Sequence, residues 1–409
     1  MKLRALALST LMVLSVLAVG LSFGTGVAAA AGNQTDVAAS DLAGEGTSDD
    51  PYQISNASEL QAMEDDLSAN YELTEDIDAS GTSEWNDDGS GPKGFDPIGA
   101  DSKAFTGSFN GSGYAISNLT INRSGESHVG LFGYLGDGTG TNWARNVTLQ
   151  DVNISGAGSV GAFVGFNDGG TVSALTVTGE VSGANDYNYV GGIIGKSLGG
   201  TVSDSDASVS VSGDSYLGGL VGINEGYVEV GESKVINSSA TGNISGKGKI
   251  GGLVGDNFGD ETSGGPYAII EDSYATGEID GEIEVGGLAG YNRGMAKVSR
   301  SYSTGAVNGS EYIGGLVGFN MDTIVKSYAT GAVNGSVYIG GLVGTHSGEI
   351  AESYATGEVT GNTDSGGLVG LTAGTVTDAY WDVNTTGKDT SDGGTPYTTD
   401  QLKANESLA

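Results

Sequence analysis

The sequence predicts an all-β protein: a parallel β-solenoid (β-helix) of about nine coils, with an N-terminal cap that contains one short helix. Three observations support this prediction. A glycine-rich motif recurs at intervals of 26 to 35 residues, and a second motif interleaves with it. Within one repeating unit, short runs of β-branched residues alternate with Gly and Asn-Gly turns, and none shows the 3.6-residue periodicity of a helix.

Composition excludes several classes of protein. The chain has 409 residues with 74 Gly and only 5 Pro, and glycine does not recur at every third position, so it is not collagen. The absence of cysteine excludes a disulfide scaffold, thiolate metal sites and thiol catalysis. The net charge of −35 disfavours nucleic acid as a partner. We expect no cofactor, although so many carboxylates can hold cations such as calcium loosely.

The N-terminal 31 residues have the pattern of a secretory signal peptide. Lys2 and Arg4 precede a mostly apolar run at residues 5–23, and an alanine-rich segment ends at Ala31. An uncleaved anchor is the alternative, because about 18 apolar residues can span a bilayer. The alanines favour cleavage near Ala29 or Ala31, so we predict a secreted or cell-surface protein with no membrane span after cleavage. Export, the lack of cysteine and the acidity together predict adaptation to high salt, where the Debye length is only about 3 Å.

Two segments precede the repeats. Residues 32–50 are small, polar and acidic, and they are predicted to be a linker. Residues 51–125 are predicted to be the N-terminal cap and the first coil, with a helix at 57–67, a strand at 71–77 and a hairpin or first coil at 105–121. A solenoid needs such a cap because an open end would expose unpaired strand edges.

The repeats themselves occupy residues 126–382, and residues 383–409 form a C-terminal tail. The motif Gly-Gly-Leu-Val-Gly or a variant begins at Gly161, Gly191, Gly218, Gly251, Gly286, Gly314, Gly340 and Gly366. Ser-Tyr-Ala-Thr-Gly or a variant begins at Ser273, Ser301, Ser327 and Ser353. A unit of 26 residues is too short for a propeller blade of about 40–50 residues, but it fits one solenoid coil. The Leu and Val of the first motif are predicted to fill the interior.

Stacking places equivalent residues in columns. An Asn recurs two residues after most copies of the glycine motif, and we expect these side chains to form a hydrogen-bonded ladder in which His346 is a substitute and not a ligand. The column Tyr302, Tyr328, Tyr354 and Tyr380 is expected to be stacked packing.

A second set of tyrosines lies two residues before the Gly pair: Tyr189, Tyr216, Tyr312 and Tyr338. Each is followed by an apolar residue, so one of the two must point inward and the other outward. If the tyrosines point outward, they are the candidates for stacking against a glycan. Asn308 and Asn334 belong to Asn-Gly-Ser sequons at turn tips and are candidates for N-glycosylation.

The consensus GGLVGxNxGxIxxSYATGxVxG resembles the GLUG-repeat family of secreted and surface bacterial and archaeal proteins, of the haloarchaeal type. The opening Asp50-Pro51-Tyr52-Gln53-Ile54 and the closing Tyr380-Trp381-Asp382 are similar to the segments that flank such repeats. The resemblance covers residues 50–403 and implies an exported, surface-associated, adhesin-like protein.

We therefore predict a non-enzymatic surface or extracellular protein whose partner is an extracellular glycan or a cell-surface protein. The alternative is a carbohydrate-active β-helix enzyme, either a polysaccharide lyase or a hydrolase. Asn362-Thr363-Asp364 resembles part of the motif of pectin-degrading β-helices, but the companion acidic, His and basic motifs are missing. Glycoside hydrolysis also needs two carboxylates at a fixed separation, and carboxylates are too abundant here to single out a pair. No catalytic, cofactor-binding or metal-binding residue is predicted.

Overall fold

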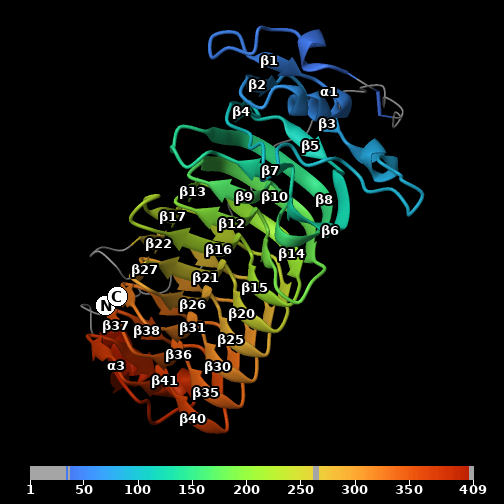
Figure 1. The fold of residues 1–409 in the computed structure, drawn as a ribbon. Coiled ribbons are helices and arrows are strands. Elements are labelled where there is room, and N and C mark those ends of the chain that lie inside the picture. Colours follow the sequence, from blue (N-terminus) through green and yellow to red (C-terminus); the bar gives the residue numbers. More distant parts are fainter. Residues whose placement is uncertain (1–33, 36, 261–266, 405–409) are drawn as a thin grey trace, which may run out of the picture.

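The computed structural model describes residues 34–35, 37–260 and 267–404, which form one elongated stack of β-coils (Figure 1). The ladders between successive coils are parallel, which confirms the predicted parallel β-solenoid. The predicted signal peptide, residues 1–31, lies outside the described part of the chain. Within that part, no helix combines the length and the apolar character needed to cross a membrane.

One coil near the C-terminal end illustrates the repeating unit. It consists of β31 (Val317–Asn320), β32 (Thr323–Val325), β33 (Tyr328–Ala329), β34 (Val333–Asn334) and β35 (Val337–Gly340). Tyr328 pairs with Tyr302 of the preceding coil and with Tyr354 of the following coil. The 26-residue spacing in the sequence is therefore one turn of the solenoid.

One face of the solenoid is a sheet of nine parallel strands, one from each coil, in agreement with the nine coils predicted. Its strands are β7 (Phe132–Leu135), β9 (Val164–Asp168), β12 (Ile194–Leu198), β16 (Val221–Gly226), β21 (Val254–Gly259), β26 (Ala289–Arg293), β31, β36 (Val343–His346) and β41 (Val369–Thr372). We call this the nine-stranded face. The other strands form a second continuous sheet, and the long strands β8 (Trp143–Gly161) and β10 (Thr171–Gly183) belong to it.

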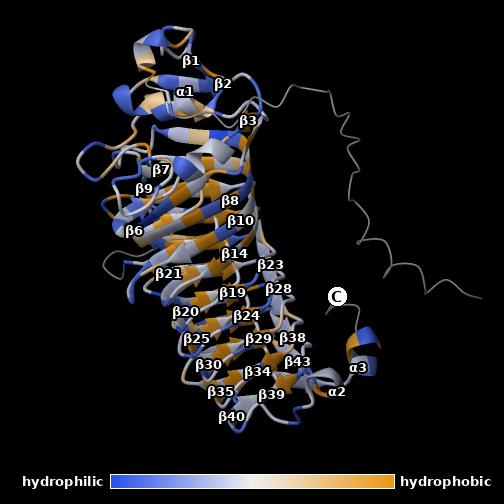
Figure 2. Cartoon of the chain, turned by 90° about the vertical axis from the view of Figure 1, so that its right-hand side faces the viewer, coloured by the Kyte–Doolittle hydropathy of each residue, from blue (hydrophilic) through white to orange (hydrophobic). Residues whose placement is uncertain are grey.

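The glycine motif supplies the core, as predicted. Leu316 and Val317 are fully buried, as are their equivalents in the other coils. The second glycine of the pair lets the coils approach each other: a Cβ on Gly315 would lie 2.1 Å from the carbonyl oxygen of Gly341 in the next coil. Figure 2 shows the resulting alternation of hydrophobic and hydrophilic residues along the strands of successive coils.

The N-terminal cap contains the predicted helix, in a shorter form. Helix α1 spans Ala57–Gln61 and continues as a 3-10 turn at Ala62–Asp65. Its N-cap is Asn56, whose side chain accepts the Glu59 N–H. Part of the segment expected to be a linker packs onto this cap, since Ala39 and Leu42 are buried.

The cap strands continue the parallel stack. β1 (Tyr52–Ile54) pairs with β2 (Asn70–Leu73), β2 with β4 (Ser108–Asn110), and β4 with β8. β5 (Ala115–Ser117) pairs with β3 (Ile77–Asp78) and β8. The hairpin alternative for residues 105–121 is therefore wrong and the first-coil alternative is correct, because β4 and β5 each pair with other segments and not with one another.

The C-terminal segment also packs onto the stack. It contains α2 (Val383–Thr386), β44 (Thr395–Tyr397) and α3 (Thr399–Ala404). β44 pairs in parallel with β43 (Tyr380–Asp382), and Trp381 Nε1 donates to the Lys388 carbonyl at 2.9 Å. These contacts cover part of the last coil.

Candidate functional site

The predicted glycan-stacking tyrosines lie on the outside of the solenoid. Tyr189, Tyr216, Tyr312 and Tyr338 are half-buried, whereas the residue after each of them is fully buried. They belong to strands β11 (Tyr189–Gly191), β15 (Ser215–Gly218), β30 (Glu311–Gly314) and β35, which lead into the nine-stranded face. Their outward orientation makes them available to a ligand, and glycan stacking itself remains a prediction.

We call this line of residues column one. Other coils carry different residues in it, among them Lys249 on β20 (Gly248–Gly251), Glu284 on β25 (Ile283–Gly286) and Asp364 on β40 (Thr363–Gly366). Column one lies at a sharp corner of the backbone, because Tyr216, Lys249, Glu284, Tyr312, Tyr338 and Asp364 all have φ between +48° and +59°. Such left-handed conformations are unfavourable for side chains with a Cβ, and they are maintained here by the stacked neighbours.

A second column of residues runs beside the first, on the nine-stranded face itself; Ile223 and Asp256 in it are buried, and the others are at least partly exposed. Each follows directly after the last glycine of the motif, and the column reads Tyr134, Phe166, Lys196, Ile223, Asp256, Tyr291, Phe319, Thr345 and Leu371. The rings of Tyr134 and Phe166 lie 4.7 Å apart, and Phe319 lies 5.6 Å from Tyr312 of column one. This second column was not predicted from the sequence, although the position directly after the glycine motif was the available signal.

The two columns together form what we call the aromatic band. It comprises Tyr134, Phe166, Tyr189, Tyr216, Tyr291, Tyr312, Phe319 and Tyr338. Its rings do not repeat one arrangement: Tyr189 and Tyr216 meet edge to face at 62°, whereas Tyr312 and Tyr338 are nearly parallel at 10° with centroids 5.2 Å apart. The band thus offers ring edges and faces along one side of a rigid scaffold.

The middle of the band carries charges. Lys196 pairs with Glu225 at 2.5 Å, and Arg293 pairs with the buried Asp256 at 2.9 Å. Arg293 lies 4.3 Å above the Phe258 ring, so its charge is also placed against an aromatic face. These pairs make the middle of the band locally balanced in charge, in contrast to the net charge of −35 of the whole chain.

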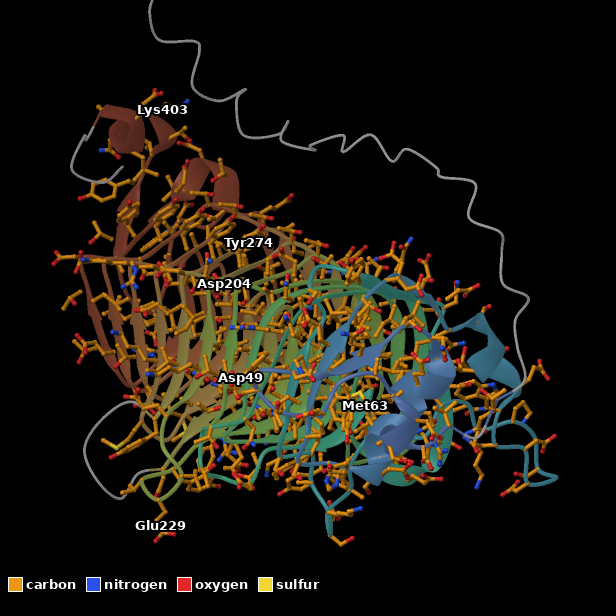
Figure 3. All side chains as sticks on the ribbon, turned by 90° about the horizontal axis from the view of Figure 1, so that it is seen from above. Asp49, Met63, Asp204, Glu229, Tyr274 and Lys403 are labelled. Carbon is orange, nitrogen blue, oxygen red and sulfur yellow. The ribbon has the colours of Figure 1, made fainter. Side chains whose placement is uncertain are left out.

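The other tyrosine column has a different geometry. Tyr274, Tyr302, Tyr328, Tyr354 and Tyr380 form a continuous stack, with neighbouring rings within 4° of parallel and 4.9 to 5.4 Å apart. Rings at this separation overlap in an offset stack, so the inner tyrosines have both faces covered. This arrangement confirms the expected stacked packing. Figure 3 shows Tyr274 on the opposite side of the solenoid from Glu229, which lies in the loop after β16.

The predicted Asn ladder is present inside the solenoid. Asn224, Asn257, Asn292 and Asn320 are fully buried, and each donates its side-chain N–H to the next at 2.7 to 2.9 Å, ending with Asn320 against His346 Nδ1 at 3.0 Å. His346 Nε2 donates to the Thr375 carbonyl at 3.1 Å, so both ring nitrogens are used. His346 is therefore a member of the ladder, as predicted.

The two sequons differ in exposure. Asn334 is exposed at the end of β34. Asn308, at the end of β29 (Val307–Asn308), is half-exposed and donates its side-chain N–H to Asp280 at 2.9 Å. Attachment of a glycan at either residue remains a prediction.

The N-terminal cap contains a surface cleft. This cleft of about 480 Å³ is lined by Lys93, Arg123 and Glu126, among others. Arg123 is buried and forms ion pairs at 2.9 Å with both Asp96 and Glu126. These two carboxylates therefore neutralise the Arg123 guanidinium, which has a structural role. In the described part of the chain, no three His, Asp or Glu side chains are close enough together to hold a metal ion.

Comparison with known proteins identifies a known motif in the repeats. The model of the GLUG motif matches residues 186–212, 213–245, 309–334 and 335–360, and the last two ranges each correspond to one 26-residue coil. The chain therefore contains copies of the GLUG motif. It is 45% identical over 150 residues to Halomucin of Haloquadratum walsbyi, a match that covers 35% of this chain and 2% of that protein.

A second relative is a candidate Gly-rich membrane protein of Evansella cellulosilytica, 38% identical over 186 residues, which are 44% of this chain and 21% of the relative. The chain thus spans only a small part of either relative. The repeats and both relatives together indicate an exported surface protein. A solved structure of a candidate immunoglobulin A1 protease from Bacteroides ovatus is also similar, with 17% identity, a TM-score of 0.44, and coverage of 81% of this chain and 86% of that one. That similarity is too weak to support a shared function.

Proposed function

We propose that this protein is a non-enzymatic, high-salt-adapted surface protein that binds extracellular glycan through the aromatic band. The observation that carries the proposal is the placement of half-buried aromatic side chains in two adjacent columns along one face. Aromatic rings present an apolar body to the C–H face of a sugar, while the tyrosine hydroxyl stays in water. An adhesive role follows, because a rigid stack repeats such contacts along its length.

The rest of the surface makes this face distinctive. Acidic residues outnumber Lys and Arg by 51 to 16, so most of the outside is negatively charged and strongly hydrated. The high-salt environment that we propose would screen the mutual repulsion of these charges. Contacts of aromatic rings with sugars depend little on ionic strength, so they would persist in the same conditions.

The chain offers a matched test, because it has two tyrosine columns of different geometry. We would measure binding of the mature protein to an array of extracellular polysaccharides in molar salt, and repeat it with the double variant Tyr312→Ala and Tyr338→Ala. The control is Tyr302→Ala with Tyr328→Ala in the offset stack. Binding should be lost in the first double variant and kept in the second. Equal loss in both, or in neither, would contradict the proposal.

The same material tests the enzymatic alternative. A lyase or hydrolase would release unsaturated or reducing ends from the glycan that it binds. Steady release by the unmodified protein would replace an adhesive function with a catalytic one. We expect binding without turnover.

A further inference from the structure

One cation of the aromatic band has a different environment from the others. Lys249 is half-buried in column one. The preceding coil carries Tyr216 and the following coil carries Tyr291. The Lys249 Nζ donates to the Tyr216 hydroxyl at 3.1 Å, and it lies 4.6 Å from the ring centroid of Tyr216 and 5.3 Å from that of Tyr291. The ammonium is thus held between a ring from the preceding coil and a ring from the following coil.

This ammonium also retains unused donors. An ammonium has three N–H donors, and Lys249 uses one of them on Tyr216. No described carboxylate lies within ion-pair distance of Lys249, whereas Lys196 and Arg293 are paired with Glu225 and Asp256. Burial lowers the pKa of Lys249, but the hydrogen bond from its ammonium to Tyr216 and the charge of Asp256 outweigh burial, so the pKa lies above its usual value. Lys249 therefore stays charged.

We propose that Lys249, with Tyr216 and Tyr291, forms a subsite for the carboxylate of an acidic sugar, so that the band prefers uronate-containing glycans to neutral ones. This inference rests on the glycan binding proposed above. The two rings would contact the sugar ring, and the free N–H donors of Lys249 would make charge-assisted hydrogen bonds to the carboxylate.

The negative charge of the protein does not oppose this subsite in its proposed environment. At molar salt the Debye length is about 3 Å, so the many distant carboxylates repel an acidic glycan only weakly. A direct contact at hydrogen-bond distance is screened much less. The nearest opposing group in column one is Glu284, one coil further along, and its removal should strengthen the subsite.

The test compares an acidic and a neutral probe of equal length, oligogalacturonate and a cello-oligosaccharide, on the mature protein in molar salt. Lys249→Met keeps the apolar stem and removes the charge. We expect about tenfold weaker binding of oligogalacturonate, since one charge-assisted contact contributes about this factor, and less than a twofold change for the neutral probe. Glu284→Gln should tighten oligogalacturonate binding. The control is Lys297→Met on β27 (Ala296–Ser299), outside the band.

The outcomes separate this inference from the function on which it rests. Equal weakening of both probes by Lys249→Met, or no weakening of the acidic one, overturns the subsite and leaves glycan binding by the band intact. If the unmodified protein binds neither probe nor any array glycan, the proposed function and the subsite both fail. A loss of the acidic probe that Lys297→Met reproduces also overturns the subsite, because general charge would then explain it.

Discussion

The buried Asn ladder allows a quantitative test of how the coils are held together. Asn292 is fully buried on β26; it accepts from Asn257 Nδ2 at 2.9 Å and donates to Asn320 Oδ1 at 2.7 Å. Replacing Asn292 by Ala removes both bonds at once. Asn257 keeps its hydrogen bond to the Ala268 carbonyl at 3.3 Å, but no other described group donates to Asn320 Oδ1.

The expected loss of stability follows from these two neighbours. A buried polar group that is left without a partner costs about 1–3 kcal/mol, and a hydrogen bond that is merely lost costs about 1 kcal/mol. For Asn292→Ala the sum is about 2–4 kcal/mol. The exposed Asn334→Ala should change stability by less than about 0.5 kcal/mol, because it leaves no buried group unpaired.

Amide hydrogen exchange is the suitable assay, because a stack of coils need not unfold in a single step. Protection should fall in β21, β26 and β31, which carry the three affected ladder residues, and should be unchanged in β41, two coils beyond β31. A uniform loss of protection along the whole stack would refute the nearest-neighbour reasoning. A change below about 0.5 kcal/mol would show that the ladder contributes little.

Three further predictions concern buried polar groups. Ser197 interrupts the Asn ladder, and the buried Oδ1 of Asn224 has no donor among the described residues, so Ser197→Asn should raise the free energy of unfolding by about 1 kcal/mol in chemical denaturation. Burial lowers the pKa of His346, so the unfolded chain binds the proton more readily; stability should fall as the pH drops below about 6.5, and His346→Asn should remove this part of the pH profile. Burial, with a contribution from Asp96, raises the pKa of Glu64 to about 7, so the folded state binds the proton more readily; stability should fall as the pH rises from 4.5 to about 7, and Glu64→Gln should flatten that slope.

The solenoid itself could be predicted because its determinants are local and repeated. Over the last three copies, Leu316, Val317 and the two preceding glycines recur every 26 residues, and the same spacing sets the register of Tyr328 against Tyr354. A short unit cannot bury its apolar side alone, so stacking is the remaining solution. The same alternation required either Tyr312 or Ile313 to point outward, and the structure shows that Tyr312 does.

The missed features lie where contacts connect different parts of a coil. Phe319 and Tyr312 are seven residues apart, and only the corner between β30 and β31 brings their rings within 5.6 Å. Likewise, Lys249 and Tyr291 come from adjacent coils and approach through their side chains. The repeat period shows which residues stack in one column. Which columns lie side by side depends on how the backbone turns between strands, and the repeat pattern does not specify this. The cap has no repeat, which explains why the alternatives for residues 105–121 were left open.

The positions that deviate from the repeat carry the information about function. Inside the coils, Gly, Leu, Val and Asn recur because close stacking tolerates little else, as the contact of Gly315 with Gly341 shows. In column one the backbone is equally constant, with φ near +55° from Tyr216 to Tyr338, yet the side chain changes from aromatic to cationic to acidic along the axis. A constant backbone with variable outward chemistry means that a substitution there should alter the proposed ligand contact without altering the fold. If the band binds glycan as proposed, single coils would set its selectivity, and Lys249 would be the residue of column one that recognises an anion.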